Sequence, residues 1–242
     1  MHDEDHLTTS PEEVEYRQQW TQLRARIASA CARAGRDPQE VQVVAVTKNV
    51  PAAKVAMALR GGWQHFGENR AQELKAKQHD LGDFSGTWHF IGQLQTNKVR
   101  DVVGQVAYIH SLDRESLAVA LQRQAERLSL CPVSCFLEVN VAQEGSKAGI
   151  VPDQATKFVQ SFHRFPNLQL VGLMTIAPLM NDPEEARPVF RQLAQLRDHL
   201  QQQGYPYAPL QHLSMGMSAD FEVALEEGAD YIRLGTLIFG SR

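Results

Sequence analysis

Short apolar segments alternate with stretches of helical periodicity along almost the whole chain, and this alternation constrains the fold more than any other feature. Repeated strand–helix–strand order favours parallel strands joined by right-handed crossovers. Eight expected strands predict a closed (β/α)8 barrel of the TIM type, in the α/β class. An open doubly wound sheet is the alternative, although such sheets usually have about five or six strands. The expected strands are 41–47, 64–66, 88–91, 107–110, 133–141, 168–174, 210–213 and 231–234, and the expected helices between them are 52–60, 70–79, 96–103, 114–128, 152–162, 183–203 and 219–227.

The two ends of the chain fit a single barrel. Its 242 residues match the usual size of this fold. Residues 235–242, which follow the last expected strand, are too few for a full outer helix. An amphipathic helix at 12–34, with Trp20, Leu23 and Ile27 on one face and a stop at Gly35, is expected to cover that gap. We therefore expect a disordered start at 1–11 and one domain over 12–242.

Composition and charge exclude several classes of function. With 43% hydrophobic and 21% charged residues the chain is an ordinary globular protein. A net charge of −4 without a basic stripe argues against nucleic-acid binding. There is no apolar stretch long enough for a membrane helix, and the acidic start is unlike a signal peptide. The cysteines, Cys31, Cys131 and Cys135, lack metal-ligand spacing and are expected to be reduced thiols packed in the core, as in a cytoplasmic protein. We also expect a monomer, because nothing in the sequence resembles a strongly apolar exposed patch.

Polar side chains gather where the expected strands end. In a barrel the active site is built from the loops at the carboxyl ends of the strands, so these residues share one rim. Lys48 ends an almost wholly apolar run of β-branched residues. A lysine desolvated in a pocket can form an imine with an aldehyde, whereas a lysine at a strand end can also simply reach out to water. Both interpretations of Lys48 remain open at this point.

The last two strand ends suit an anion. Phosphate sites in barrels often follow strands seven and eight, at a helix start. Ser214 and Gly216 lead into the expected helix at 219–227, for which Ser218 is a plausible N-cap, and Gly216 lets backbone amides approach an anion closely. Gly235 and Thr236 add another amide and a hydroxyl. The alternative is an ordinary cap and an ordinary turn.

Other rim residues each have a functional and a structural interpretation. Strand alternation puts Arg233 on the face opposite its neighbours, pointing into the barrel mouth, where it could instead form an ion pair with Glu138. Asn69 could bind a ligand hydroxyl or cap the helix at 70–79. Histidines on the strands could bind a metal, but no carboxylate or cysteine pattern supports one. No nucleophile elbow, P-loop or dinucleotide fingerprint is present.

Several segments, in the same order, resemble the pyridoxal phosphate homeostasis protein family, the YggS/PROSC-like proteins. The resemblance runs from about Val41 to the end of the chain. Small departures are Thr47, Asn49 and Gln93, which leave the lysine and phosphate segments intact. The matching segments are 45–48 (Ala-Val-Thr-Lys), 65–69 (His-Phe-Gly-Glu-Asn), 88–98 (Trp-His-Phe-Ile-Gly-Gln-Leu-Gln-Thr-Asn-Lys), 146–149 (Ser-Lys-Ala-Gly), 172–174 (Gly-Leu-Met), 213–220 (Leu-Ser-Met-Gly-Met-Ser-Ala-Asp) and 233–240 (Arg-Leu-Gly-Thr-Leu-Ile-Phe-Gly).

The resemblance implies a fold and a cofactor. The fold would be the barrel of alanine racemase and its relatives, fold type III, and the cofactor pyridoxal 5′-phosphate, bound as an imine on Lys48. The family is regarded as handling vitamin B6 without an established turnover reaction, so Lys48 would be the only candidate catalytic residue. Arg233 would face the pyridine nitrogen, Asn69 and Met174 would line the pocket, and Ser214, Gly216, Gly235 and Thr236 would hold the phosphate.

Three hypotheses follow for the function. The first is a carrier that buffers pyridoxal phosphate or delivers it to pyridoxal-phosphate-dependent apoenzymes. The second is an amino-acid racemase with one-base chemistry on Lys48. Two observations favour the carrier: the chain ends too soon for the second domain that two-base racemases use, and an arginine at the ring nitrogen weakens the ring as an electron sink. The third is a sensor that reports cofactor status to a partner through the loops at 93–100 and 146–149.

Overall fold

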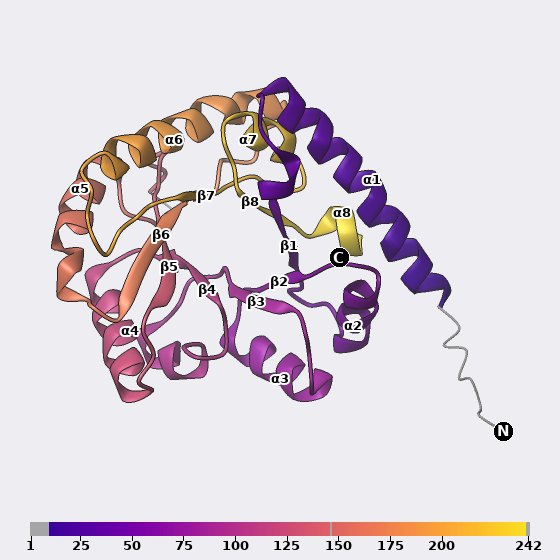
Figure 1. Cartoon of the computed structure of the whole chain (residues 1–242), viewed down its shortest axis with the longest axis horizontal. Helices are drawn as coiled ribbons and strands as arrows, with labels where there is room; N and C mark the ends of the chain where they lie inside the picture. Colours follow the sequence, from indigo (N-terminus) through magenta and orange to yellow (C-terminus); the bar gives the residue numbers. More distant parts are fainter. Residues whose placement is uncertain (1–9, 146, 241–242) are drawn as a thin grey trace.

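A computed structural model describes residues 10–145 and 147–240, and over these residues the strands close into a barrel. Each strand pairs in parallel with the next along the chain, and the last pairs back with the first, so the predicted (β/α)8 barrel is confirmed (Figure 1). The strands are β1 (Gln42–Val46), β2 (His65–Glu68), β3 (Thr87–Phe90), β4 (Tyr108–Leu112), β5 (Val133–Glu138), β6 (Leu168–Met174), β7 (His212–Ser214) and β8 (Tyr231–Leu234).

Helices surround this barrel in a ring (Figure 1). The predicted helix boundaries hold within a few residues for most of the outer helices. The α-helices are α1 (Pro11–Arg33), α2 (Ala52–Arg60), α3 (Ala71–Leu81), α4 (Glu115–Arg127), α5 (Pro152–Gln160), α6 (Arg187–Gln201), α7 (Phe221–Glu226) and α8 (Thr236–Phe239). Short 3-10 helices are η1 (Pro38–Glu40), η2 (Thr96–Asp101), η3 (Ser161–Arg164) and η4 (Pro183–Ala186).

Three local predictions are corrected. The expected helix at 96–103 is the 3-10 helix η2, since Thr, Asn and Val in this segment are poor helix formers. The expected helix at 219–227 begins only at α7, because the Asp220 carboxylate accepts the N–H of Met217 (2.6 Å) and closes a turn before it. Strand β7 begins two residues later than the expected start at Leu210, which has a φ of 47° and so leaves the extended backbone of a strand.

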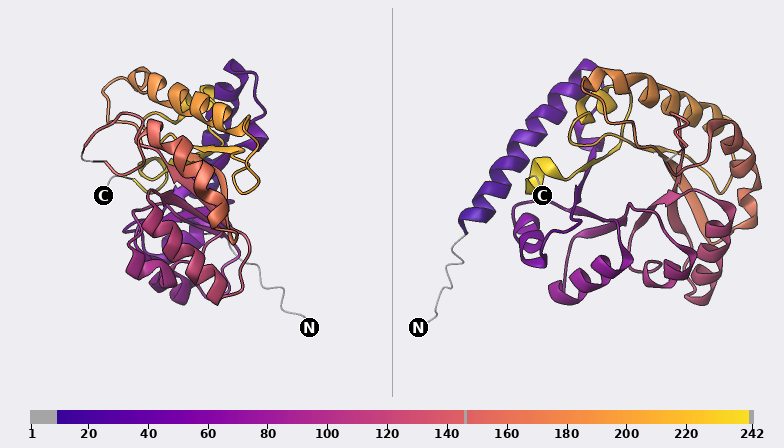
Figure 2. Two further views of the ribbon diagram at one scale, coloured as in Figure 1. Left: turned by 90° about the vertical axis from the view of Figure 1, so that its left-hand side faces the viewer. Right: turned by 180° about the vertical axis from the view of Figure 1, so that it is seen from behind.

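Helix α1 takes the outer position that the end of the chain leaves uncovered. It lies outside β1 and β8, beside α8 (Figures 1 and 2). Ion pairs from Arg26 to Glu222 (2.8 Å) and from Arg33 to Glu226 (2.5 Å) join it to α7. This placement was predicted from the leftover length of the chain.

The start of α1 differs from the prediction. Ser10 and Pro11 were expected in the disordered start, but they begin the helix. The hydroxyl of Ser10 accepts the N–H of Glu13 (3.2 Å), and the Glu13 carboxylate accepts the N–H of Ser10 (3.4 Å), which is a complete capping box. The rest of the expected disordered start, residues 1–9, lies outside the described residues.

Two hydrophobic clusters lie on opposite faces of the barrel wall. The outer cluster packs the strands against the helices and contains Ile232 and Leu234 of β8. Alternation along β8 therefore turns Arg233 inward, as predicted. The inner cluster fills the barrel and contains Val44, Ile91, Phe136, Val171, Met174 and Tyr231.

The cysteines and the membrane prediction can be compared with this fold. All three cysteines are free. Cys31 and Cys135 are buried as expected, and burial raises the pKa of the Cys135 thiol to about 12. Cys131 is exposed, so its expected place in the core is wrong; it lies in the loop before β5. None of the described helices combines the length and apolar character needed to cross a membrane.

Removing the contact of α1 with the barrel should destabilise the fold. Ile27 is fully buried in α1, so Ile27→Ala is expected to lower the free energy of unfolding by about 2–5 kcal/mol. Gln22→Ala, on the exposed face of the same helix, should change it by less than about 0.5 kcal/mol. Urea unfolding of both variants measures the difference, and equal effects would contradict this role of α1.

Candidate functional site

Strand register gathers the predicted site residues at one rim of the barrel. Val44 of β1 pairs with Arg233 of β8, and Val46 pairs with Gly67 of β2. Lys48 follows directly, between the loop after β2 and the loop after β8. Strand β6 ends at Met174, which pairs with Ser214 of β7. The carboxyl-end rim and its loops thus contain Lys48, Asn69, Met174, Ser214, Gly216, Arg233, Gly235 and Thr236.

Lys48 is half-buried in a turn directly after β1. Both neighbours are tied to the rest of the rim. The N–H of Thr47 donates to the carbonyl of Gly67 (2.9 Å), which continues the pairing of β1 with β2. Asn49 has a left-handed φ of 58°, and its N–H donates to the carboxylate of Glu73 in α3 (2.9 Å). The backbone of Lys48 is therefore fixed from both sides.

A buried ion pair lies under this turn. Lys77 of α3 pairs with Glu68 at the end of β2, and both side chains are buried. The Glu68 carboxylate also accepts the hydroxyl of Thr47 (2.6 Å), while the Lys77 ammonium donates to the carbonyl of Thr47 (2.8 Å). Sequence reasoning missed this pair. The available signal was the three-residue spacing from Leu74 to Lys77, which puts Lys77 on the buried face of α3.

Breaking this pair on one side should be more harmful than removing both charges. Lys77→Met leaves Glu68 buried without its cation and is expected to lower the free energy of unfolding by about 3–5 kcal/mol. Adding Glu68→Gln should recover part of that loss. Lys75→Met, on the exposed face of α3, is the control. Urea unfolding that shows no difference between Lys77→Met and Lys75→Met would refute the role of the pair.

Arg233 is a buried cation without a carboxylate partner. It is 5% exposed; one N–H group donates to the hydroxyl of Ser214 (2.7 Å) and another to the carbonyl of Thr175 (2.8 Å). Within the described residues it forms no ion pair, so the predicted alternative of a direct ion pair with Glu138 is not seen, although the charges of Glu138 and Asp220 act on it. Burial lowers the pKa of Arg233 to about 10, so it is still protonated at neutral pH. The guanidinium retains donors for a further acceptor.

Glu138 contributes a second unusual charge near the mouth. It ends β5, is buried, and pairs in register with Met174 of β6, a fully buried member of the inner cluster. Burial and, to a smaller extent, the charge of Asp113 raise the pKa of Glu138 to about 7, while the charge of Arg233 acts in the opposite direction. At neutral pH the mouth therefore contains a carboxyl group that changes its protonation readily.

The serine that ends β7 and the serine in the loop after it lie in different surroundings. The hydroxyl of Ser214 is fully buried and contacts the Arg233 guanidinium and the ring of His110 (2.9 Å), so it lies inside the barrel. The hydroxyl of Ser218 accepts the N–H of Gly235 (3.3 Å). Ser218 is thus not the predicted N-cap of α7, whose cap position is Asp220. The sequence did not reveal which serine faces the loop after β8.

Gly216 cannot be replaced without distortion. Its φ is 91°, and a Cβ atom there would lie 2.5 Å from the Cβ of Ala224 in α7. This close approach seats the loop after β7 against α7, beside Ser218 and Gly235. Thr236, the remaining predicted residue, is exposed at the start of α8.

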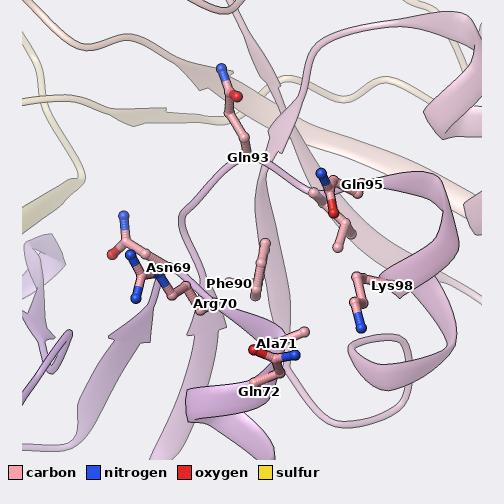
Figure 3. A pocket seen from close by; sticks show the side chains of 9 residues that line it. Asn69, Arg70, Ala71, Gln72, Phe90, Gln93, Gln95 and Lys98 are labelled. Carbon is pink, nitrogen blue, oxygen red and sulfur yellow. The ribbon is translucent and has the colours of Figure 1, made fainter.

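Asn69 lies between two cavities. One, of about 330 Å³, is lined by Asn69, Arg70 and Lys98 among others (Figure 3). The other, of about 350 Å³, is lined by Asn69, Glu138 and Lys147 among others. The side-chain oxygen of Asn69 is buried and accepts no hydrogen bond from the residues that the structure describes. The predicted capping alternative is not seen, because α3 has Arg70 at its cap position.

Comparison with known proteins agrees with this geometry. A sequence profile described as "Alanine racemase, N-terminal domain" matches residues 19–242. The "Pyridoxal phosphate homeostasis protein" of Aquifex aeolicus is 45% identical over 217 residues, covering 90% of this chain and 94% of that protein. The chain belongs to the pyridoxal phosphate homeostasis protein family. Its relative of the same name in Pseudomonas aeruginosa is 40% identical over 218 residues, covering 90% of this chain and 92% of that protein.

A solved structure of another protein supports the same assignment. PipY of Synechococcus elongatus, with pyridoxal phosphate bound, is 38% identical to this member of the family, with a TM-score of 0.81. The match covers 93% of this chain and 100% of PipY.

Proposed function

We propose that this protein binds pyridoxal 5′-phosphate on Lys48 and takes part in vitamin B6 homeostasis by holding and supplying the cofactor. Relatives covering nearly the whole chain are named for that role, and PipY binds the same cofactor. One observation carries the assignment to these residues. A buried guanidinium that forms no ion pair within the described residues lies on β8, next to β1, the strand that leads into Lys48.

The residues at the rim fit the groups of this cofactor. Pyridoxal phosphate supplies an aldehyde that condenses with an amine, with loss of water, to give an imine. Lys48 provides the amine. Arg233 keeps its proton and can only donate, so it suits a ring nitrogen that stays unprotonated. Asn69 offers an unpartnered oxygen, and Met174 provides an apolar wall.

The phosphate-binding group is proposed at the loops after β7 and β8. Gly216, Gly235 and Thr236 keep their predicted roles, with Gly216 allowing the close approach of the backbone. Ser218 is added to the set because its hydroxyl already contacts the N–H of Gly235. Ser214 is assigned to support Arg233 from behind rather than to contact the phosphate directly.

The covalent attachment can be tested by absorption spectroscopy. The purified protein, incubated with pyridoxal phosphate, should show an imine band, and borohydride should trap a reduced adduct on Lys48 in a peptide mass spectrum. Lys48→Ala should lack both the band and the adduct. Lys54→Ala, an exposed lysine on α2, should retain them. An adduct on other lysines only, or no band in the wild type, would refute the proposal.

A carrier should exchange no substrate proton. An arginine at the ring nitrogen disfavours the protonated ring that stabilises carbanions, so we propose a carrier rather than a one-base racemase. Incubation of the loaded protein with L-alanine in heavy water should leave the α-proton in place, measured by proton NMR. Loss of that proton at a rate that Lys48→Ala abolishes would favour the racemase.

The recipients and assembly state are further parts of the proposal. We propose delivery to pyridoxal-phosphate-dependent apoenzymes in the cytoplasm, by a monomer. Support for the monomer comes from the large exposed apolar side chains, which lie in α1, just after α4, in the loops after β6 and α6, and in α8. Among the described residues they are Val14, Leu128, Ile176, Leu179, Tyr207 and Leu237.

A further inference from the structure

Three histidines form a continuous hydrogen-bonded row inside the barrel. Nδ1 of His65 lies 3.0 Å from Nε2 of His89, and Nδ1 of His89 lies 3.0 Å from Nε2 of His110. Nδ1 of His110 lies 2.9 Å from the hydroxyl of Ser214, which accepts from Arg233 (2.7 Å). The row therefore leads from the amino end of β2 to the guanidinium at the proposed cofactor site.

The row is buried and its rings are held in place. His89, His110 and Ser214 are fully buried, whereas His65 is only half-buried. The ring of Tyr108 stacks on His89, with centroids 5.0 Å apart, and Phe136 stacks on His110 at 4.3 Å. The ring nitrogens lie at hydrogen-bond distance from one another, and among the described residues no group of three or more His, Cys, Asp or Glu side chains is placed to hold a metal ion.

Proton counting allows only two arrangements of this row. A neutral imidazole donates from one nitrogen and accepts at the other, so one ring's tautomer dictates the next. In the first arrangement Ser214 donates to Nδ1 of His110, and each ring donates from Nε2 to the next, ending with His65 donating outward. In the second, every bond is reversed, and Ser214 accepts from both His110 and Arg233. The cation of Arg233 favours the first, in which Ser214 turns its lone pairs toward Arg233.

Protonation of His65 converts the first arrangement into the second. A doubly protonated His65 must donate from Nδ1, so His89 has to accept there and donate onward to His110. Relative to the first arrangement the molecule gains one proton, which His65 holds in addition to its own. His89 and His110 keep one proton each but carry it on Nδ1 instead of Nε2, and the hydroxyl of Ser214 keeps its proton and rotates it away from His110.

We propose that this row is a relay that couples proton occupancy of His65, at the amino end of the barrel, to the orientation of Ser214 and Arg233, and thereby to cofactor affinity. The inference rests on the proposed function for its last step only. His89 and His110 act as positioning residues for Arg233. In the reversed arrangement the oxygen of Ser214 is shared between His110 and Arg233, which weakens the hydrogen bond that positions Arg233, so acid is expected to weaken cofactor binding.

The ionisation of the groups around the row is consistent with entry of the proton at His65. Burial lowers the pKa of His89 to about 3, holds that of His110 well below its ordinary value, and also lowers that of His65. The proton therefore settles on the half-buried ring. The other titratable groups that face the row are Tyr108 and Tyr231, with His212 and Asp230 beyond Tyr231, and those around Arg233 are Glu138 and Asp220.

The relay itself can be tested without cofactor. NMR of the full chain with nitrogen-15-labelled histidine, from about pH 5.5 to 8.5, reports which ring nitrogen carries the proton. The expected result is Nε2–H on all three rings at high pH, and a switch of His89 and His110 to Nδ1–H that follows the protonation of His65. His65→Gln should abolish the switch, and His212→Gln should not. Fixed tautomers at His89 and His110 while His65 titrates would overturn the relay.

The coupling to the cofactor site needs a second readout. Spectroscopic titration with pyridoxal phosphate should show an affinity loss on acidification that is larger in the wild type than in His65→Gln by about fivefold or more. His89→Phe, which interrupts the row, should show the same pH dependence of affinity as His65→Gln, and His212→Gln the same as the wild type. All of these proteins retain Glu138, so its titration is common to them. Identical pH profiles would overturn the coupling. Failure of the wild type to bind would refute the proposed function, while the NMR result still decides the relay.

Discussion

The buried guanidinium of Arg233 is the constraint on which the interior of this barrel depends. A charge removed from water needs compensation, and a carboxylate partner would neutralise it and consume its donors. Here the hydroxyl of Ser214 and the carbonyl of Thr175 serve instead. Neutral acceptors leave the charge available to a ligand. This arrangement explains the row of imidazoles, because His110 at its end gives the hydroxyl of Ser214 a hydrogen-bond partner deep in a core that is otherwise apolar.

The other half of the site is stabilised differently. Lys48 lies in a turn fixed by the buried pair of Glu68 and Lys77, where full charges do meet. This pair satisfies the backbone carbonyl and hydroxyl of Thr47 below the turn, so the protein itself holds the backbone that leads into Lys48. A lysine that must reach an aldehyde benefits from a rigid backbone, whereas a guanidinium that must contact a ring benefits from spare donors. The two neighbouring strand ends meet these different needs.

What could be predicted from the sequence depends on whether a feature is set by neighbouring residues or by contacts between residues far apart in the chain. Strand–helix alternation is local and repeated, so the barrel, the inward face of Arg233 and the rim residues were predictable. The roles of Ser214 and Ser218 were not, because they depend on the path of the loop after β7, which is set by Gly216 against α7 and by Asp220 closing a turn. The histidine row also needed three-dimensional register. Alternation puts His65, His89 and His110 inward, but only the pairing of β2, β3 and β4 brings their nitrogens together.

These features bear on why a barrel of this kind would hold a cofactor rather than use it. Catalysis on pyridoxal phosphate requires charge to flow into the ring, and a carboxylate at the ring nitrogen promotes this by keeping it protonated. In the proposed site Arg233 would act in the opposite sense. Its charge is compensated by the dipoles of Ser214 and Thr175 rather than by an ion pair within the described residues, and the proposed reversal of the histidine row would let the strength of its contact with a ligand vary with pH. The proposed covalent anchor on Lys48, combined with such an adjustable contact, would suit reversible storage better than turnover.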